Sequence, residues 1–381
     1  MNRSLNVLQF TCPNGFYGAE RWILALAKNL NAASVNCSLA VTKEPGSGNE
    51  EVARHFRALG NAVYEIPMTG RFDLRVIKRL CQLIKQEKID IIHTHGYKSD
   101  ILGFIAARLT GIKAISTPHG FVNVEQWKLR LYYSFGNRFF KWFDVVAPLS
   151  KQLCEDMKRL RVPDKKIHYI QNGVDVDEIE SLKSIGDELP AKEAGVKRIG
   201  FIGQITKRKN IGEIIKVYRK LSAKHSNLEL VLLGDGELLE TFREQVKAIG
   251  DASNIKFLGF QSNRLNWLRT FDLFVMTSSL EGIPRCMMEA MAMGVPVAAY
   301  RIPGIDQLIQ HGETGLLADY GDAEMLEDQW EKLLFDDGLS NRIATAGRHL
   351  ILEKFSGKRM AQEYTHLFQQ MMGHKAVLAT D

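Results

Sequence analysis

The sequence predicts an α/β protein with two domains, each built around a doubly wound parallel sheet. At 381 residues the chain is longer than one core usually serves and fits two domains of about 150 to 200 residues. Short β-branched runs alternate with longer amphipathic segments, which is the rhythm of βαβ units. The rhythm stops after Asn172 and restarts near Arg198. We therefore expect a first domain at 1–172, a hinge at 173–195 and a second domain at 196–355.

Each predicted strand is a short apolar run, and the amphipathic segments at 20–30 and 74–85 are predicted helices. In an open α/β sheet the ligand lies beyond the carboxyl ends of the strands, so residues directly after strands are the site candidates. Neither first strand is followed by a GxGxxG motif, which argues against a dinucleotide cofactor. The predicted strands are 5–10, 37–41, 62–65, 89–93, 113–117 and 145–147 in the first half, and 198–202, 228–233, 255–257, 273–276 and 295–298 in the second.

Composition indicates a soluble globular protein, with 45% hydrophobic and 25% charged residues. The five cysteines have no CxxC spacing, so neither a disulfide framework nor a zinc site is predicted, and a reducing compartment fits. No run of 18 apolar residues occurs. We expect a cytoplasmic protein without a membrane span.

Charge is unevenly distributed along the chain. Residues 1–172 hold 25 Lys/Arg against 14 Asp/Glu, and the remainder holds 25 against 30. A basic first half fits an anionic partner, which could be a membrane surface, a phosphorylated acceptor or a nucleic acid. Solvated lysines on helix faces are the alternative interpretation.

The strongest local pattern runs from Ser278 to Val297 and predicts a strand end, a tight turn, a helix and the next strand. Glu281 lies in the turn, and Glu289 lies within the first two turns of a helix that begins near Pro284. Free N–H groups at a helix N-terminus can hold a diphosphate, and carboxylates accept hydrogen bonds from hydroxyls. Each glutamate alone also fits an ordinary turn or helix acid. The pair predicts a nucleotide-sugar site.

This pattern, with Glu-Gly-x-Pro and Glu-Ala-Met-Ala, resembles the signature of the retaining family 4 glycosyltransferases. The resemblance covers nearly the whole chain and implies the GT-B fold: two Rossmann-like domains that face each other across a cleft, with a C-terminal helix near 357–372, in the segment 356–381, crossing back to the first domain. Further motifs that match in order and spacing are Phe16-Tyr-Gly-Ala-Glu-Arg21, Thr117-Pro-His-Gly120, Ile170-Gln-Asn-Gly-Val-Asp175, Gly200-Phe-Ile-Gly203 through Lys209, Leu233-Gly-Asp-Gly236 and Glu313-Thr-Gly-Leu-Leu317.

The resemblance assigns roles to residues of the second half. Glu281 would contact the hydroxyls of the transferred sugar, and Glu289 the ribose. Backbone N–H groups around Gly282 and Ile283 would meet the sugar or diphosphate. Lys209 would neutralise the leaving diphosphate, so that neither a catalytic metal nor another cofactor is expected.

One position departs from the family pattern. Gln204 stands where the family usually has an arginine directly after the glycine, so one phosphate-binding cation is missing from its usual place. Lys207 or Arg208 could substitute. A solvated charge run at a strand–helix junction is the alternative for these basic residues.

His119 follows a predicted strand, and the resemblance places it against the donor sugar as a supporting residue. The family is thought to use a front-face mechanism in which the leaving phosphate takes the acceptor proton, so no strong protein base is required. His93 alternates inward like a core residue, and His95 is a candidate acceptor-side contact.

Glycines after strands complete the predicted donor site. Gly15 and Gly18 follow the first strand and would let the backbone approach the diphosphate. Gly234, Gly236 and Phe260 follow strands of the second half and are expected to line the base pocket.

Residues 124–143 mix basic and aromatic side chains, a composition that suits a membrane interface or a helix half-buried on the sheet. A lipid-linked acceptor would fit both this segment and the basic first half, and no nucleic acid is expected as partner. The inner face of the cytoplasmic membrane is then a possible location.

The combined prediction is retaining transfer of a hexose or related sugar from a UDP- or GDP-sugar to a glycan or lipid-linked acceptor, in bacterial surface polysaccharide synthesis. Domain closure would exclude water from the donor. The alternatives are a nucleotide-sugar epimerase or a phosphorylase on the same fold, or a non-catalytic binding subunit, which Gln204 makes credible.

Overall fold

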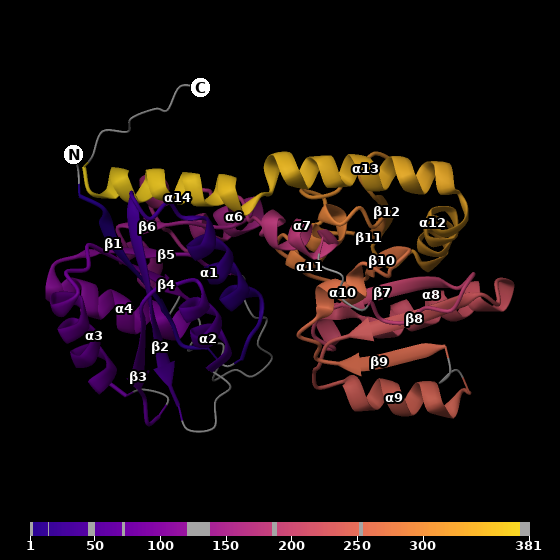
Figure 1. Cartoon of the computed structure of the whole chain (residues 1–381), viewed down its shortest axis with the longest axis horizontal. Helices are drawn as coiled ribbons and strands as arrows, with labels where there is room; N and C mark the ends of the chain where they lie inside the picture. The colour runs from indigo at the N-terminus through magenta and orange to yellow at the C-terminus, as the bar shows by residue number, and fades with distance from the viewer. Residues whose placement is uncertain are drawn as a thin grey trace. The chain divides into compact units, whose positions relative to one another are not determined.

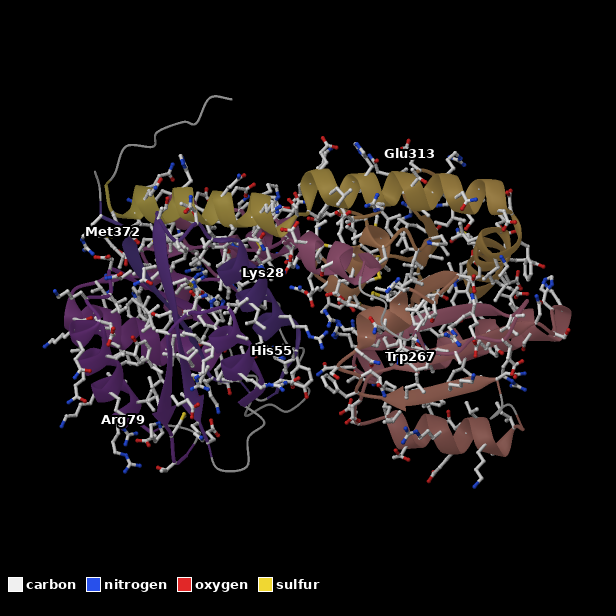
Figure 2. All side chains as sticks on the ribbon, in the orientation of Figure 1. Lys28, His55, Arg79, Trp267, Glu313 and Met372 are labelled. Atoms are coloured by element: carbon white, nitrogen blue, oxygen red, sulfur yellow. The ribbon has the colours of Figure 1, made fainter. Side chains whose placement is uncertain are left out.

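The computed structural model describes residues 3–13, 15–44, 50–70, 73–119, 138–184, 189–250 and 254–373 (Figure 1). The chain forms two compact units, Met1–Gly173 with Gly357–Asp381, and Val174–Ser356. Each unit has one six-stranded sheet with all described strand pairs parallel, and side chains fill both faces of each sheet (Figure 2).

The sheet of the first unit has the order β3-β2-β1-β4-β5-β6. Two separate clusters of apolar side chains pack on its two faces: one includes residues of α1 and α14, and the other includes residues of α3 and α4. The elements are β1 (Leu5–Thr11), α1 (Gly18–Asn29), β2 (Val35–Lys43), α2 (Glu50–Ala58), β3 (Val63–Pro67), α3 (Arg75–Gln86), β4 (Ile91–His95), α4 (Tyr97–Thr110), β5 (Lys113–Ser116), η1 (Arg138–Trp142), β6 (Val145–Val146), α6 (Lys151–Arg159), η2 (Asp164–Lys166) and α14 (Gly357–Met371).

The sheet of the second unit has the order β12-β11-β10-β7-β8-β9. One apolar cluster includes residues of α7, α11 and α13, and the other includes residues of α8 and α12 on the opposite face. The elements are α7 (Val176–Ser184), β7 (Lys197–Ile202), η3 (Lys207–Lys209), α8 (Ile211–Lys224), β8 (Leu228–Leu233), α9 (Leu239–Ala248), β9 (Ile255–Gly259), α10 (Arg264–Leu268), β10 (Leu273–Met276), α11 (Arg285–Ala292), β11 (Val297–Arg301), β12 (Leu316–Asp319), α12 (Ala323–Phe335) and α13 (Asp337–Lys354).

Several details differ from the sequence expectation, among them the strand predicted at 89–93, which the structure places at Ile91–His95. The strand predicted at 295–298 begins at Val297, because the Val295 N–H still bonds to Ala290 O at the end of α11. β12 was not predicted. Part of the expected hinge at 173–195 forms α7, whose Ile179 is buried in the core of the second unit.

Candidate active site

The candidate site of the second unit lies where the strand order of its sheet reverses. From β7 the chain proceeds outward through β8 and β9, and from the neighbouring β10 it proceeds the other way through β11 and β12. Loops beyond the carboxyl ends of the two central strands diverge at such a point and leave room for a ligand. The loop after β7 carries η3, and the loop after β10 carries Glu281.

These two loops are held together by backbone contacts. The N–H of Ser279 donates to Arg208 O at 2.9 Å, and the Thr277 hydroxyl donates to Asn210 O at 2.9 Å. Asn210 adopts a left-handed conformation with φ 52° between η3 and α8. The side chains at the end of η3 are therefore positioned by the same contacts that position the turn after β10.

Glu281 forms an ion cluster with both basic residues at the end of η3. The Lys209 ammonium donates to Glu281 Oε1 at 2.6 Å, and the Arg208 guanidinium donates to the same oxygen at 2.8 Å. Arg208 also donates to Leu280 O at 2.6 Å. Only 8% of the Lys209 side chain and 9% of the Glu281 side chain are exposed, so this pair is largely withdrawn from water.

Electrostatics keep Glu281 ionised. Burial acts to raise the pKa of Glu281, but Lys209 and Arg208 outweigh it and hold this pKa below its ordinary value. One carboxylate beside two cations leaves the cluster with a net positive charge. Such a cluster can accept hydrogen bonds from hydroxyls through Glu281 and attract phosphate oxygens through Lys209 and Arg208.

The backbone of the turn after β10 is shaped for close approach. Ile283 and Pro284 are buried, and Pro284 is the residue before the first turn of α11. Nothing lies within 4 Å of the position where Gly282 would carry a side chain. Gly304 has φ +97°, and a Cβ there would lie 1.9 Å from Gly282 O, so only glycine allows this approach.

Glu289 is buried and has two arginine partners. Arg264 donates to its two oxygens at 2.7 and 3.2 Å, and Arg285 donates at 2.9 Å. Sequence reasoning did not single out these arginines. Arg285 could have been found, because it lies four residues before Glu289 on the same helix. Arg264 comes from α10, and no local spacing connects it to α11.

The two glycines after β8 have a packing role in the described structure. Gly234 has φ +137°, and a Cβ there would lie 1.8 Å from Gly203 O; at Gly236 a Cβ would lie 2.4 Å from Ile205 O. These glycines let the loops after β7 and β8 touch. Gln204 lies in the loop after β7 and is exposed.

Phe260, directly after β9, has 47% of its surface exposed, so its ring is accessible to a ligand. Its predicted place beside the nucleotide base stays a prediction.

The predicted residues of the first unit lie near the carboxyl ends of β1 and β5, on the two sides of β4. His119 follows β5 and hydrogen bonds to His95 at the end of β4, with 3.1 Å between the His119 Nε2 and His95 Nδ1 atoms. Burial lowers the pKa of His119 to about 3, so the ring is neutral. Gly15 lies in the loop from β1 into α1 and Gly18 is the first residue of α1, where a Cβ would meet no described atom within 4 Å. Most of segment 124–143, for which a membrane interface and a half-buried helix are the alternatives, lies outside the described residues.

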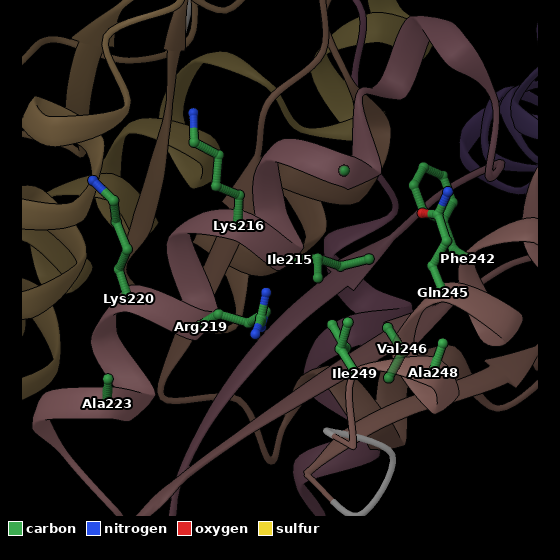
Figure 3. Close-up of a pocket in the computed structure, with 11 residues that line it drawn as sticks. Ile215, Lys216, Arg219, Lys220, Ala223, Phe242, Gln245, Val246, Ala248 and Ile249 are labelled. Carbon is green, nitrogen blue, oxygen red and sulfur yellow. The ribbon is translucent and has the colours of Figure 1, made fainter.

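A cavity of about 760 Å³ lies in the second unit between α8 and α9 (Figure 3). Among the described residues that line it are Lys216, Arg219 and Phe242, and none of the predicted site residues.

No helix in the described parts of the chain is both long and apolar enough to cross a membrane. In the same parts, no group of three or more His, Cys, Asp or Glu residues is arranged to hold a metal.

Comparison with known proteins places this architecture in the class of GT-B glycosyltransferases. The model for glycosyl transferases group 1 matches residues 188–350, and the model for glycosyltransferase family 4 matches residues 16–178. A structure of a Rickettsia africae glycosyltransferase superposes with a TM-score of 0.80, at 20% identity over 98% of this chain and 100% of that one. The Anabaena protein HepE in complex with UDP-glucose gives a TM-score of 0.78, at 19% identity over 97% and 99% of the two chains.

Sequence relatives agree with the structural neighbours. N-acetyl-alpha-D-glucosaminyl L-malate synthase of Bacillus anthracis is 28% identical, over 81% of this chain and 82% of its own length. UDP-Gal:alpha-D-GlcNAc-diphosphoundecaprenol alpha-1,3-galactosyltransferase of Escherichia coli is 29% identical, over 80% and 81%. The chain belongs to the family 4 glycosyltransferases, as its motifs predicted.

Proposed function

We propose that this protein is a retaining glycosyltransferase that moves a hexose or related sugar from a nucleotide diphosphate-sugar to a glycan or lipid-linked acceptor. The observation that carries the proposal is the cluster of Glu281, Lys209 and Arg208 at the reversal point of the second sheet. It combines an acceptor for sugar hydroxyls with cations for a diphosphate in one place.

Each member of the cluster has a distinct part in the proposed reaction. Negative charge grows on the diphosphate as the glycosidic bond breaks, and Lys209 and Arg208 stabilise it without a metal ion. Glu281, held ionised by these cations, accepts hydrogen bonds from the hydroxyls of the transferred sugar. The leaving phosphate takes the proton of the acceptor hydroxyl, which gives retention on the front face. His119 serves as a neutral supporting residue.

We propose that the nucleotide of the donor is UDP. HepE was solved with UDP and with UDP-glucose, and the Escherichia coli relative is named for a UDP-galactose donor and a diphosphoundecaprenol-linked acceptor. A lipid-linked acceptor of this kind would bring the protein to the inner face of the cytoplasmic membrane, where a basic first half is favourable.

The decisive experiment compares Glu281→Gln with Glu240→Gln, an exposed glutamate on α9. With a panel of UDP- and GDP-sugars and lipid-linked or glycan acceptors, Glu281→Gln should lose about 10²- to 10³-fold in transfer rate while UDP binding persists. Glu240→Gln should behave like wild type. Unchanged transfer in Glu281→Gln would contradict the proposal.

Two further measurements separate the proposal from its rivals. Chelation with EDTA should leave the rate unchanged, and the product should keep the anomeric configuration of the donor. Conversion of the donor sugar without any acceptor would instead indicate an epimerase.

A further inference from the structure

A buried chain of three polar side chains crosses the centre of the first unit. It runs from Gln9 on β1 through His95 at the end of β4 to His119 after β5. The His95 Nε2 atom lies 2.8 Å from Gln9 Oε1, and its Nδ1 atom lies 3.1 Å from His119 Nε2. Gln9 is fully buried and His95 is 4% exposed. The His95 ring is therefore cut off from bulk water, and His119 is half-buried.

Burial keeps both imidazoles neutral. It lowers the pKa of His119 to about 3 and the pKa of His95 well below its ordinary value. A neutral imidazole has one N–H donor and one bare nitrogen acceptor. In a hydrogen-bonded chain of such rings, the tautomer of one ring therefore fixes the tautomer of the next. The group at the start of the chain decides that orientation.

Gln9 is the first group of this hydrogen-bonded chain. With Gln9 Oε1 as acceptor, the proton of His95 must be on Nε2, which leaves His95 Nδ1 bare. His119 must then donate from its own Nε2, which leaves its Nδ1 bare. On the other side of the Gln9 amide lies the thiol of Cys37, which is only a weak acceptor. Burial raises the pKa of this thiol to about 12. Among the described residues the buried Gln9 Nε2 atom has no hydrogen-bond partner, so the Gln9 amide contacts the chain through Oε1.

Trp22 locks the rings in place. It is 1% exposed, and its ring centroid lies 5.3 Å from that of His95 and 5.2 Å from that of His119. Contacts this close restrict the rotation of both imidazoles. Packing therefore preserves the ring orientation that the hydrogen bonds require.

We propose that Gln9 and His95 are positioning residues that hold His119 in the tautomer protonated on Nε2. Its Nδ1 is then an obligate acceptor, able to bind a donated hydroxyl proton but unable to donate one. The identification of that hydroxyl as one on a sugar rests on the proposed function. The assignment of the His119 tautomer is independent of that function.

His93 offers a matched control. Its ring contacts that of His95 at a tilt of 43°, with ring centroids 4.3 Å apart, and it is fully buried. Its Nε2 atom pairs with Thr117 Oγ1 at 2.7 Å, and that hydroxyl pairs with Tyr364 OH at 2.8 Å. Among the described residues, this second chain makes no hydrogen bond to His119. Replacement of His93 should thus disturb packing without changing the His119 tautomer.

The experiment is ¹⁵N NMR of the full-length protein with labelled histidines, in which the His119 signals are identified by their loss in His119→Asn. In wild type, Nε2 of His119 should be the protonated nitrogen and Nδ1 the bare one. His95→Phe and the milder Gln9→Met should convert His119 to a mixture of tautomers, whereas His93→Phe should not. A wild-type proton on Nδ1, as the opposite Gln9 amide orientation would give, overturns the proposal even if no variant folds.

Kinetics provide the second measurement. His95→Phe should lower kcat/KM on the order of tenfold relative to His93→Phe, the scale found for groups that orient functional histidines. Equal losses in the two variants would show that His95 acts only through packing. If the NMR result holds but no sugar is transferred by the wild-type protein, the positioning proposal stands and the proposed function fails.

Discussion

At the residue scale, Arg208 is a candidate for the cation that Gln204 does not supply. The sequence left Lys207 and Arg208 as alternatives. In the structure the Arg208 guanidinium reaches Glu281, beside Lys209, whereas Lys207 is exposed. Arg208 is thus the better placed of the two to supply the second charge that a leaving diphosphate needs.

Relocation of this charge tests the assignment. Arg208→Gln should lower kcat/KM about tenfold to a hundredfold, because one charge-assisted contact to the leaving group is lost. Adding Gln204→Arg to that variant should restore part of the loss. Steady-state kinetics with a UDP-sugar would measure both effects. Lys207→Gln is the control, and a loss there as large as in Arg208→Gln would contradict the assignment.

Asp100 is a buried acid that the proposed reaction does not use. Its Oδ1 atom accepts from the Thr94 hydroxyl at 2.5 Å and from the Ser116 hydroxyl at 2.7 Å. Burial outweighs these contacts and raises the pKa of Asp100 to about 7. The folded state therefore binds this proton more tightly than the unfolded chain does.

The raised pKa of Asp100 has a defined effect on stability. Its contribution is fully present below about pH 4, the unfolded value, and is lost as the pH rises to about 7. Asp100→Asn removes this dependence, so its free energy of unfolding relative to wild type should rise between pH 4 and pH 7, by at most about 4 kcal/mol. Urea titrations across this range would measure it. Asp328→Asn, at an exposed acid, should show no such trend.

At the element scale, Gly234 permits a loop contact that other residues would prevent. Gly234 combines a positive φ with a Cβ position 1.8 Å from Gly203 O. Gly250 also has a positive φ, of +80°, but its Cβ position meets nothing within 4 Å. A substitution at Gly250 would therefore report backbone strain alone, whereas one at Gly234 would report strain and steric clash together.

Alanine substitutions make that separation measurable. Gly250→Ala should cost about 1 to 2 kcal/mol from strain alone. Gly234→Ala should cost more than that, since the loops after β7 and β8 must also part. Denaturation midpoints of the two variants give the comparison, and equal costs would argue against the loop contact.

The sequence predicted elements well where a strand or helix is set by its own pattern. The strands at 228–233 and 273–276 have the predicted bounds, because each is a fully buried run that is apolar except for Glu229. The Lys209–Glu281 pair was assigned to one site from motif order. The partnership of Arg264 with Glu289 and that of Gln9 with His95 were not foreseen, because each joins elements distant in sequence and no local spacing records such a contact.

At the scale of the whole molecule, the first unit is built from two separate segments of the chain. The first unit is completed by α14, after the whole of the second unit has been traversed. Tyr364 and Phe368 of this helix are fully buried against the sheet, and Phe368 lies edge-on to His93, with ring centroids 5.8 Å apart. The final helix is therefore part of the core that surrounds the histidines.

Truncation of one side chain tests this dependence. Phe368→Ala should destabilise the first unit by about 3 to 5 kcal/mol, because a large buried ring leaves a cavity. Hydrogen exchange should show the loss of protection in β1, β4 and β5. Gln370→Ala, at an exposed position two residues later, should change stability by no more than about 0.5 kcal/mol.

The placement of α14 also bears on biosynthesis. While the ribosome translates the segment between Gly173 and Gly357, the nascent N-terminal sheet lacks its last apolar cover. At about 5 to 20 residues per second, that interval lasts roughly 10 to 40 s. During this time the unfinished face is exposed to aggregation and to chaperones, so yield in cells should respond to the rate of elongation as much as to equilibrium stability.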